Sequence, residues 1–147
     1  MIEVDTLGAS DRAAWTELFR AYHAFYGRPS VPDAELERSW RELAGGNRMH
    51  ALGARVDGEL VGIAHFLVHA STTSSDVCYL QDLYTTPATR GQGVGRALIA
   101  AVSNWARDQG CCRVYWHTQA DNVTARTLYD KVAENRGFIV YTQPLNV

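Results

Sequence analysis

Hydrophobic and polar positions change their spacing several times along the chain, and each spacing predicts one kind of element. Alternation over residues 2–5 predicts a short strand, and apolar side chains at helical spacing from Trp15 to Tyr26 predict a helix that begins near Ser10. The predicted elements, in chain order, are a strand at 2–5, a helix between Ser10 and Gly27, a helix between Pro32 and Gly45, strands at 49–56, 59–69 and 76–85, a helix between Val94 and Gly110, a strand at 112–118, a helix between Asn122 and Gly137, and a strand at 138–142.

This order, β-α-α-β-β-β-α-β-α-β, predicts a mixed α/β (α+β) protein built on one sheet. The turn signal Asp57-Gly58 predicts a hairpin, so the sheet is expected to be mostly antiparallel. The strand at 76–85, the helix after it and the strand at 112–118 form a crossover, which implies a central parallel pair. Because no linker, repeat or low-complexity segment divides the chain, we expect a single domain over residues 1–147.

The composition agrees with one globular domain, and the cysteine content bears on the cellular compartment. The chain has 147 residues, of which 46% are hydrophobic and 20% are charged, so it can bury a core without a disulfide or a metal. Three cysteines are present, and the adjacent pair Cys111 and Cys112 is unsuited to a disulfide or a four-ligand zinc site. We therefore expect no metal and a location in the reducing cytoplasm.

Charge and hydropathy exclude several classes of partner. The formal net charge is -2 and no block of Lys and Arg stands out, so the sequence predicts no nucleic-acid partner. No run approaches eighteen apolar residues and no signal-like start is present, so we expect neither membrane insertion nor secretion.

A glycine-rich turn, Arg90-Gly91-Gln92-Gly93-Val94-Gly95-Arg96, leads into the helix that follows the strand at 76–85. Free backbone N–H groups and the helix dipole make such a turn an anion site, with phosphate as the natural ligand. The turn lacks the lysine of a nucleotide P-loop, and Arg96 replaces the small sixth residue of a dinucleotide fingerprint.

Arg90, Gly93 and Gly95 match the Arg/Gln-x-x-Gly-x-Gly/Ala signature that the GNAT superfamily of acyl-CoA-dependent N-acetyltransferases carries between a strand and a helix. The chain resembles this superfamily over nearly its whole length, and within it the yeast-type histone and polyamine acetyltransferases and their bacterial relatives. The resemblance implies acetyl-CoA as co-substrate, with its pyrophosphate on residues 91–96 and its pantetheine arm along the preceding strand. The coenzyme-binding residues that it implies are Leu83, Tyr84, Thr85, Arg90, Gly91, Gln92, Gly93, Val94, Gly95, Arg96, Asn122 and Tyr129.

The sequence offers several candidates for the catalytic base. An alkylamine with a pKa of about 10.4 is neutral in well under 1% of molecules at pH 7, so a base or a water relay is useful. The family often has a glutamate where this chain has Gln81, and an amide can only hold a water that relays the proton. Asp82 is the nearest carboxylate, but adjacent strand residues face opposite sides of a sheet unless the strand is bulged. His65, His69 and His117 are alternative bases.

The remaining roles follow from the resemblance. Tyr129 is implied as the hydrogen-bond or proton donor to the departing thiolate, and a backbone N–H in the region of Leu83 to Thr85 as the oxyanion donor. Gln81, Asp82 and Tyr129 are thus the predicted catalytic residues. Asp82 and Tyr129 also have plainer interpretations, as a structural carboxylate and a core tyrosine.

The first two helices are expected to wall the acceptor site. Their aromatic residues either contact a cationic amine or serve only as core, and their acidic residues are candidate partners for its charge. These candidates are Trp15, Tyr22, Phe25, Tyr26 and Trp40, with Asp33, Glu35 and Glu37.

The leading hypothesis is acetyl transfer to the primary amine of a small molecule, such as a polyamine, an amino acid or an amino sugar. The alternatives are a protein lysine or N-terminal acetyltransferase and, because of Gln81, an idle acyl-CoA-binding module. Relatives of this kind are commonly homodimers, and the segment Phe138 to Leu145 either pairs between subunits or forms a last strand with a covered edge.

Overall fold

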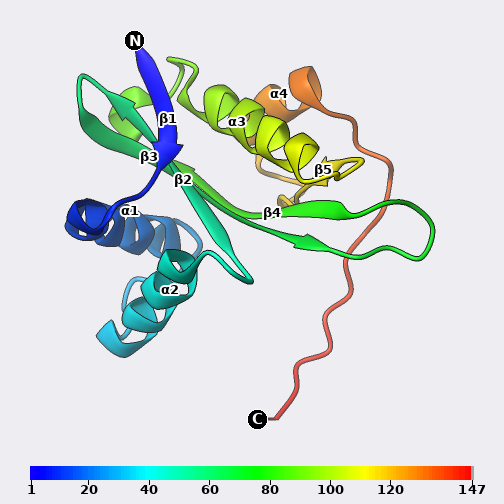
Figure 1. Ribbon diagram of the computed structural model, residues 1–147, viewed down its shortest axis with the longest axis horizontal. Helices are drawn as coiled ribbons and strands as arrows, with labels where there is room; N and C mark the ends of the chain where they lie inside the picture. Colours follow the sequence, from blue (N-terminus) through cyan, green and yellow to red (C-terminus); the bar gives the residue numbers. More distant parts are fainter. Residues whose placement is uncertain (147) are drawn as a thin grey trace. The chain divides into compact units, whose positions relative to one another are not determined.

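The computed structural model describes residues 1–146 and divides the chain into two compact units, Met1–His117 and a second that begins at Thr118 (Figure 1). The elements of the first unit are β1 (Ile2–Thr6), α1 (Arg12–Phe25), α2 (Asp33–Gly45), β2 (His50–Val56), β3 (Glu59–His69), β4 (Val77–Thr85), α3 (Val94–Asp108) and β5 (Val114–Tyr115), with short 3-10 turns at Ala9–Asp11 and Pro87–Thr89. The second unit contains α4 (Val123–Val132).

The first unit is built on one sheet in the order β1-β2-β3-β4-β5. The pairs from β1 to β4 are antiparallel, and β4 pairs with β5 in parallel after the crossover through α3. Asp57 and Gly58, with φ of 52° and 80°, make the turn of the β2–β3 hairpin. The predicted antiparallel sheet with a central parallel pair is confirmed.

The helices of the first unit cover both faces of this sheet. α3 packs on β3 and β4 on one face, and α1 and α2 lie on the other (Figure 1). α3 buries one side chain in each turn along the sheet, including Val94, Leu98 and Val102, which matches its predicted apolar face. No helix of residues 1–146 is both long and apolar enough to cross a membrane.

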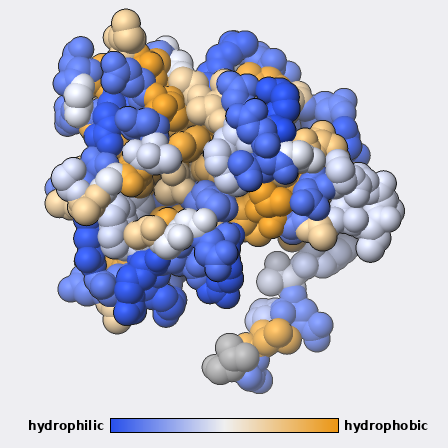
Figure 2. Space-filling view, viewed as in Figure 1, coloured by the Kyte–Doolittle hydropathy of each residue, from blue (hydrophilic) through white to orange (hydrophobic). Residues whose placement is uncertain are grey.

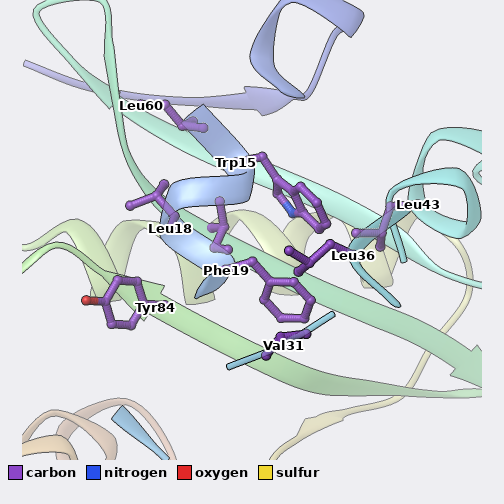
Figure 3. Close-up of a cluster of buried hydrophobic side chains, with 9 residues drawn as sticks. Trp15, Leu18, Phe19, Val31, Leu36, Leu43, Leu60 and Tyr84 are labelled. Atoms are coloured by element: carbon purple, nitrogen blue, oxygen red, sulfur yellow. The ribbon is translucent and has the colours of Figure 1, made fainter. Parts of the chain in front are cut away.

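An aromatic cluster fills the space between the sheet and the α1–α2 pair. Trp15 is fully buried, and its ring centroid lies 5.2 Å from that of Phe19 and 5.1 Å from that of Trp40. Leu36 and Leu43 of α2 close the cluster beside Trp15 (Figure 3). Trp15 and Trp40 therefore pack in the core, as the plainer interpretation of these aromatic positions expects.

Two predicted strands differ from the structure. The strand expected at 112–118 is reduced to β5, Val114–Tyr115, and the strand expected at 138–142 is wrong, because residues 134–146 form neither helix nor strand. A strand exists only where its N–H and C=O groups pair with a neighbour, and no described strand pairs with this segment. Phe138 and Tyr141 are 88% and 89% exposed, so the segment is apolar without being part of a core.

Gly62 of β3 lies under α3 and provides a test of this packing. A Cβ at Gly62 would lie 3.0 Å from side-chain atoms of Leu98 and Val94 and 3.3 Å from the backbone oxygen of Tyr84. We expect Gly62→Ala to destabilise the fold by about 1–3 kcal/mol, because both α3 side chains are buried and the strand cannot move away. Urea unfolding measures this.

Gly45→Ala is the matched control for that substitution. No atom lies within 4 Å of a Cβ at Gly45, which ends α2, so alanine there should leave stability unchanged or raise it by up to about 1 kcal/mol. Equal stability of the two variants would show that α3 does not press on β3 at Gly62.

Candidate active site

β4 carries a β-bulge at Gln81. His65 of β3 pairs with Asp82, and the next residue of β3, Phe66, pairs with Leu80, so Gln81 has no partner on β3. A bulge inserts one extra residue and breaks the strict alternation of side chains about the sheet. Gln81 and Asp82, although adjacent, therefore both line one cavity. The structure therefore contains the bulge that the sequence analysis set as the condition for Gln81 and Asp82 to face one site.

Asp82 is the end of a buried chain of hydrogen bonds. His65 Nδ1 lies 2.9 Å from Asp82 Oδ2, and Trp15 Nε1–H donates to His65 Nε2 over 2.9 Å. Trp15 and His65 are 0% and 1% exposed, whereas Asp82 is 8% exposed. The ring of Phe19 meets His65 edge-on with centroids 4.8 Å apart. The chain thus runs through the aromatic cluster and reaches the cavity at Asp82.

The cavity lies where α1, α2 and the start of β2 face β3 and β4, and it holds about 240 Å³. Besides His65, its polar lining consists of Arg38, Ser39, Glu42, Arg48, Gln81 and Asp82. Glu42 pairs with Arg48. Within residues 1–146, Arg38 makes neither a hydrogen bond nor an ion pair, so the cavity carries one guanidinium available to a ligand. Hydrophilic side chains dominate the surface where α2 lies in Figure 2.

Burial and the charge of Asp82 raise the pKa of three tyrosines, Tyr22, Tyr26 and Tyr79. Burial raises the pKa of Tyr22 and Tyr26 above the ordinary value, and the negative charge of Asp82 raises both further. Burial, Tyr115 and Asp82 likewise raise the pKa of Tyr79. The three hydroxyls therefore stay protonated at neutral pH and can act as O–H donors.

One edge of β4 is left without a strand partner beside the bulge. Parallel pairing with β5 is confined to Cys78–Val114 and Tyr79–Tyr115. From Leu80 to Thr85, no strand of residues 1–146 pairs with that edge. Because a bulge bends a strand and increases its twist, pairing ends where the bulge begins. The open edge offers alternating N–H and C=O groups to an extended ligand.

The glycine-rich turn caps α3 without any side chain. Gly91 and Gly93 have φ of 82° and 88°, a left-handed conformation that side chains with a Cβ rarely adopt. Gly93 is the N-cap of α3, and no side chain among the described residues accepts a hydrogen bond from this helix start. The first N–H groups of α3 therefore have no side-chain acceptor among the described residues and lie at the positive end of the helix dipole.

Arg90 stands at the start of this turn between two aromatic rings. Its Cζ lies 5.6 Å from the ring centroid of Phe25 and 5.5 Å from that of Tyr84. These contacts attach the turn to the end of α1 and to β4. Phe25, considered above for the acceptor site, thus contacts an arginine of the turn.

Asn122 and Tyr129 belong to the second unit and are described within it. Asn122 is the N-cap of α4, and its Oδ1 accepts a hydrogen bond from Ala125 N–H over 3.4 Å. Seven residues separate Asn122 from Tyr129, about two helical turns, so the two share one face of α4. Their roles remain predictions from the resemblance.

Several candidates from the sequence lie elsewhere. His69 Nε2 is 2.8 Å from the Tyr115 hydroxyl, and His117 Nδ1 is 3.3 Å from that of Tyr79. Neither histidine lines the cavity. The acidic candidates of α2 do not line it either, but form surface ion pairs: Asp33 with Arg20, Glu35 with Arg28, and Glu37 with Arg12 and Arg41.

Sequence reasoning missed the α2 residues that do line the cavity. Arg38 and Glu42 are four residues apart and so share a helical face, but the apolar spacing of Leu36, Trp40 and Leu43 directs attention to the buried side. The polar pair Arg38 and Glu42, spaced i, i+4 beside those apolar residues, could have indicated a helical face that lines a site.

Comparison with known proteins identifies the class to which this fold and site belong. The acetyltransferase (GNAT) family matches residues 13–133. The chain is 32% identical over 143 residues to the D-amino-acid N-acetyltransferase HPA3 of Saccharomyces cerevisiae, covering 95% of this chain and 89% of that protein. It is 35% identical over 127 residues to an aminoglycoside N(6')-acetyltransferase type 1 of Stenotrophomonas maltophilia, covering 82% and 77%.

Solved structures agree on the fold. The structure of AAC(6')-Iy in complex with the bisubstrate analogue CoA-S-monomethyl-acetylneamine superposes with a TM-score of 0.87 and covers 99% of both chains at 20% sequence identity. The chain therefore belongs to the GNAT acetyltransferase family. It is an acyltransferase whose co-substrate is acetyl-CoA, so the alternative of an idle binding module is set aside.

Proposed function

We propose that this enzyme transfers the acetyl group of acetyl-CoA to the primary amine of a small molecule, specifically an amino acid. The observation that carries the proposal is Asp82, a nearly buried carboxylate that lines a cavity beside the bulge of β4. A carboxylate in such a place attracts the cationic amine and accepts its proton.

The coenzyme has a matching surface next to that carboxylate. The pyrophosphate is assigned to the N–H groups of Gly91, Gln92, Gly93, Val94, Gly95 and Arg96, with Arg90 beside them. The pantetheine arm is assigned to the open edge of β4 at Leu83, Tyr84 and Thr85, where it takes the place of a paired strand. Both assignments rest on backbone groups, which need no particular side chain. The N–H of Gln92 donates to the Thr89 carbonyl over 3.2 Å and would have to leave that bond to reach the phosphate.

The reaction is assigned as direct attack. Asp82 takes a proton from the acceptor ammonium, and the electrons of that N–H bond become the lone pair that attacks the thioester carbonyl. A backbone N–H in the region of Leu83 to Thr85 stabilises the oxyanion, and collapse of the tetrahedral intermediate expels the thiolate with the C–S bonding electrons. Tyr129 is assigned as the donor of a proton to that thiolate, and the second amine proton restores the tyrosine hydroxyl.

Gln81 has a supporting role in this scheme. Its amide lines the same cavity as Asp82 and cannot accept a proton at working pH, but it can hold a water by one donor and one acceptor. We assign it to the water through which the proton on Asp82 returns to solvent.

The charges of the cavity support an acceptor that carries both an amine and a carboxylate. Asp82 suits the ammonium, and the unpaired guanidinium of Arg38 suits a carboxylate, which arginine binds through two parallel hydrogen bonds. The volume of about 240 Å³ is below that of typical drug-sized pockets and fits a small substrate. The match to the yeast D-amino-acid N-acetyltransferase supports the same class.

We also propose that the enzyme works as a cytoplasmic homodimer. Its cysteines Cys78, Cys111 and Cys112 are free, as expected in a reducing compartment. The C-terminal segment exposes Phe138, Ile139, Val140, Tyr141 and Leu145, an apolar set that a second copy would cover. Orange side chains stand out near the end of this segment in Figure 2.

The Arg38 assignment is tested with a thiol-release assay against amino acids, their amides, a polyamine, an aminoglycoside and a lysine peptide. Arg38→Ala should raise KM for the preferred amino acid about 10–100-fold, because a charged hydrogen-bonded pair is lost, and should leave KM for the amino acid amide unchanged. Arg41→Ala is the control, since Arg41 lies on α2 outside the cavity. Fastest turnover with the polyamine, the aminoglycoside or the peptide would contradict the proposed acceptor.

The pyrophosphate assignment is tested at both ends of α3. Gly93→Val should weaken coenzyme A binding about tenfold or more in calorimetry, because the branched side chain blocks approach to the helix N-terminus. Gly110→Val has the same kind of strain, with φ of 86° and open space around its Cβ, but lies beyond the other end of the helix. Unchanged affinity in Gly93→Val, or an equal loss in Gly110→Val, would remove the support for this cradle.

The dimer is tested by sedimentation velocity. The wild type should sediment as a dimer, and Ile139→Asp should shift it to a monomer because a charge is placed in the covered apolar segment. A wild-type monomer across the working concentration range would refute this assembly.

A further inference from the structure

The hydrogen-bond chain from Trp15 through His65 to Asp82 limits where protons can sit. An indole N–H can only donate, so His65 Nε2, which lies 2.9 Å from Trp15 Nε1, must offer a lone pair. The histidine then carries its single ring proton on Nδ1 and donates it to Asp82 Oδ2 over 2.9 Å. A second ring proton, on Nε2, would face the indole N–H and leave two buried donors without acceptors, at a cost typical of unsatisfied buried groups.

We propose that Trp15 and His65 are positioning residues that hold Asp82 as a fixed carboxylate anion, with the indole N–H acting as a lock that keeps His65 neutral. The proposal rests on the proposed function of Asp82 as the proton acceptor. With the lock in place, Asp82 is the member of the pair that takes the acceptor's proton. Without it, His65 can bind a second proton and form an ion pair that makes Asp82 a poorer base.

Burial is what makes the lock effective. Trp15 is 0% and His65 1% exposed, so water cannot replace either hydrogen bond. Every buried polar side-chain atom of the described residues has a hydrogen-bond partner, which fits a polar chain with a single assignment of donors and acceptors. The aromatic rings of Phe19 and Trp15 flank the imidazole and oppose its rotation.

Other titratable or charged groups also surround this pair. They are Tyr22 and His23 of α1, Tyr26 at the C-cap of α1, Arg38 and Glu42 of α2, Arg48 before β2, and Tyr79 of β4. Burial, followed by the charge of Arg28, lowers the pKa of His23, so this histidine is a second source of pH dependence on the acid side. The test therefore measures the pH profile of each substitution twice, once with His23 present and once combined with His23→Gln.

Trp15→Phe removes the indole N–H and keeps an aromatic ring. We expect the acid limb of kcat/KM to move up by about one pH unit, so that the variant loses about tenfold more activity at pH 6 than at pH 9. Trp40→Phe is the matched control, because Trp40 packs on Trp15 with centroids 5.1 Å apart but takes no part in the chain. A purely structural role for Trp15 predicts an equal loss at every pH, and that result would overturn the proposal.

A second measurement uses only the wild-type protein and does not depend on turnover. Long-range ¹H–¹⁵N NMR of the wild type should show His65 with its proton on Nδ1 and an unprotonated Nε2 down to acidic pH. A proton on Nε2, or a doubly protonated ring at neutral pH, would overturn the lock. Wild-type turnover in Asp82→Asn would instead refute Asp82 as the base, whatever the tautomer of His65, so the two failures are distinguishable.

Discussion

The site depends on one residue that β4 has and β3 lacks. Because Gln81 has no partner on β3, the strand turns Asp82 toward the cavity while its neighbour stays beside it, and pairing with β5 ends at Tyr79. A regular strand would have put Asp82 and Gln81 on opposite faces and kept its edge paired. One extra residue thus produces both the acidic wall of the cavity and the open edge along which a second substrate can lie.

Local signals predicted most of the fold. The hairpin at Asp57-Gly58, the helix starts and the parallel pair follow from residues close together in the chain or from the handed crossover. The strand at 138–142 failed because a strand needs a partner, and apolar alternation does not say whether one is present. The bulge at Gln81 could be named only as a condition, since it is a property of two strands in register.

The site was predictable to the extent that single residues carry their own chemistry. Asp82 was a candidate because it is the carboxylate nearest to Gln81, with a structural carboxylate as the alternative, and the glycine turn was recognised by its match to the signature of the family. The hydrogen bond from Trp15 to His65 joins residues fifty positions apart, and the sequence around neither residue predicts it. Trp15 was left open between a core position and a contact to the amine. It packs in the core, and its one polar atom bonds His65, which lines the cavity. Buried aromatic residues with a hydrogen-bonding atom are therefore easy to assign to packing and hard to assign to function.

The contacts of Arg90 with α1 and β4 affect the conformational entropy of its side chain. A free arginine loses rotamer freedom when it closes on an anion, and this entropy, close to 2 kcal/mol for a long side chain, is subtracted from its affinity. Here the guanidinium already lies between the rings of Phe25 and Tyr84, from α1 and β4. Much of that ordering is completed during folding, so the side chain is held in a restricted set of conformations before any ligand arrives. The aromatic end of α1 consequently lowers the entropic cost of any contact that Arg90 makes with a ligand, without touching that ligand itself.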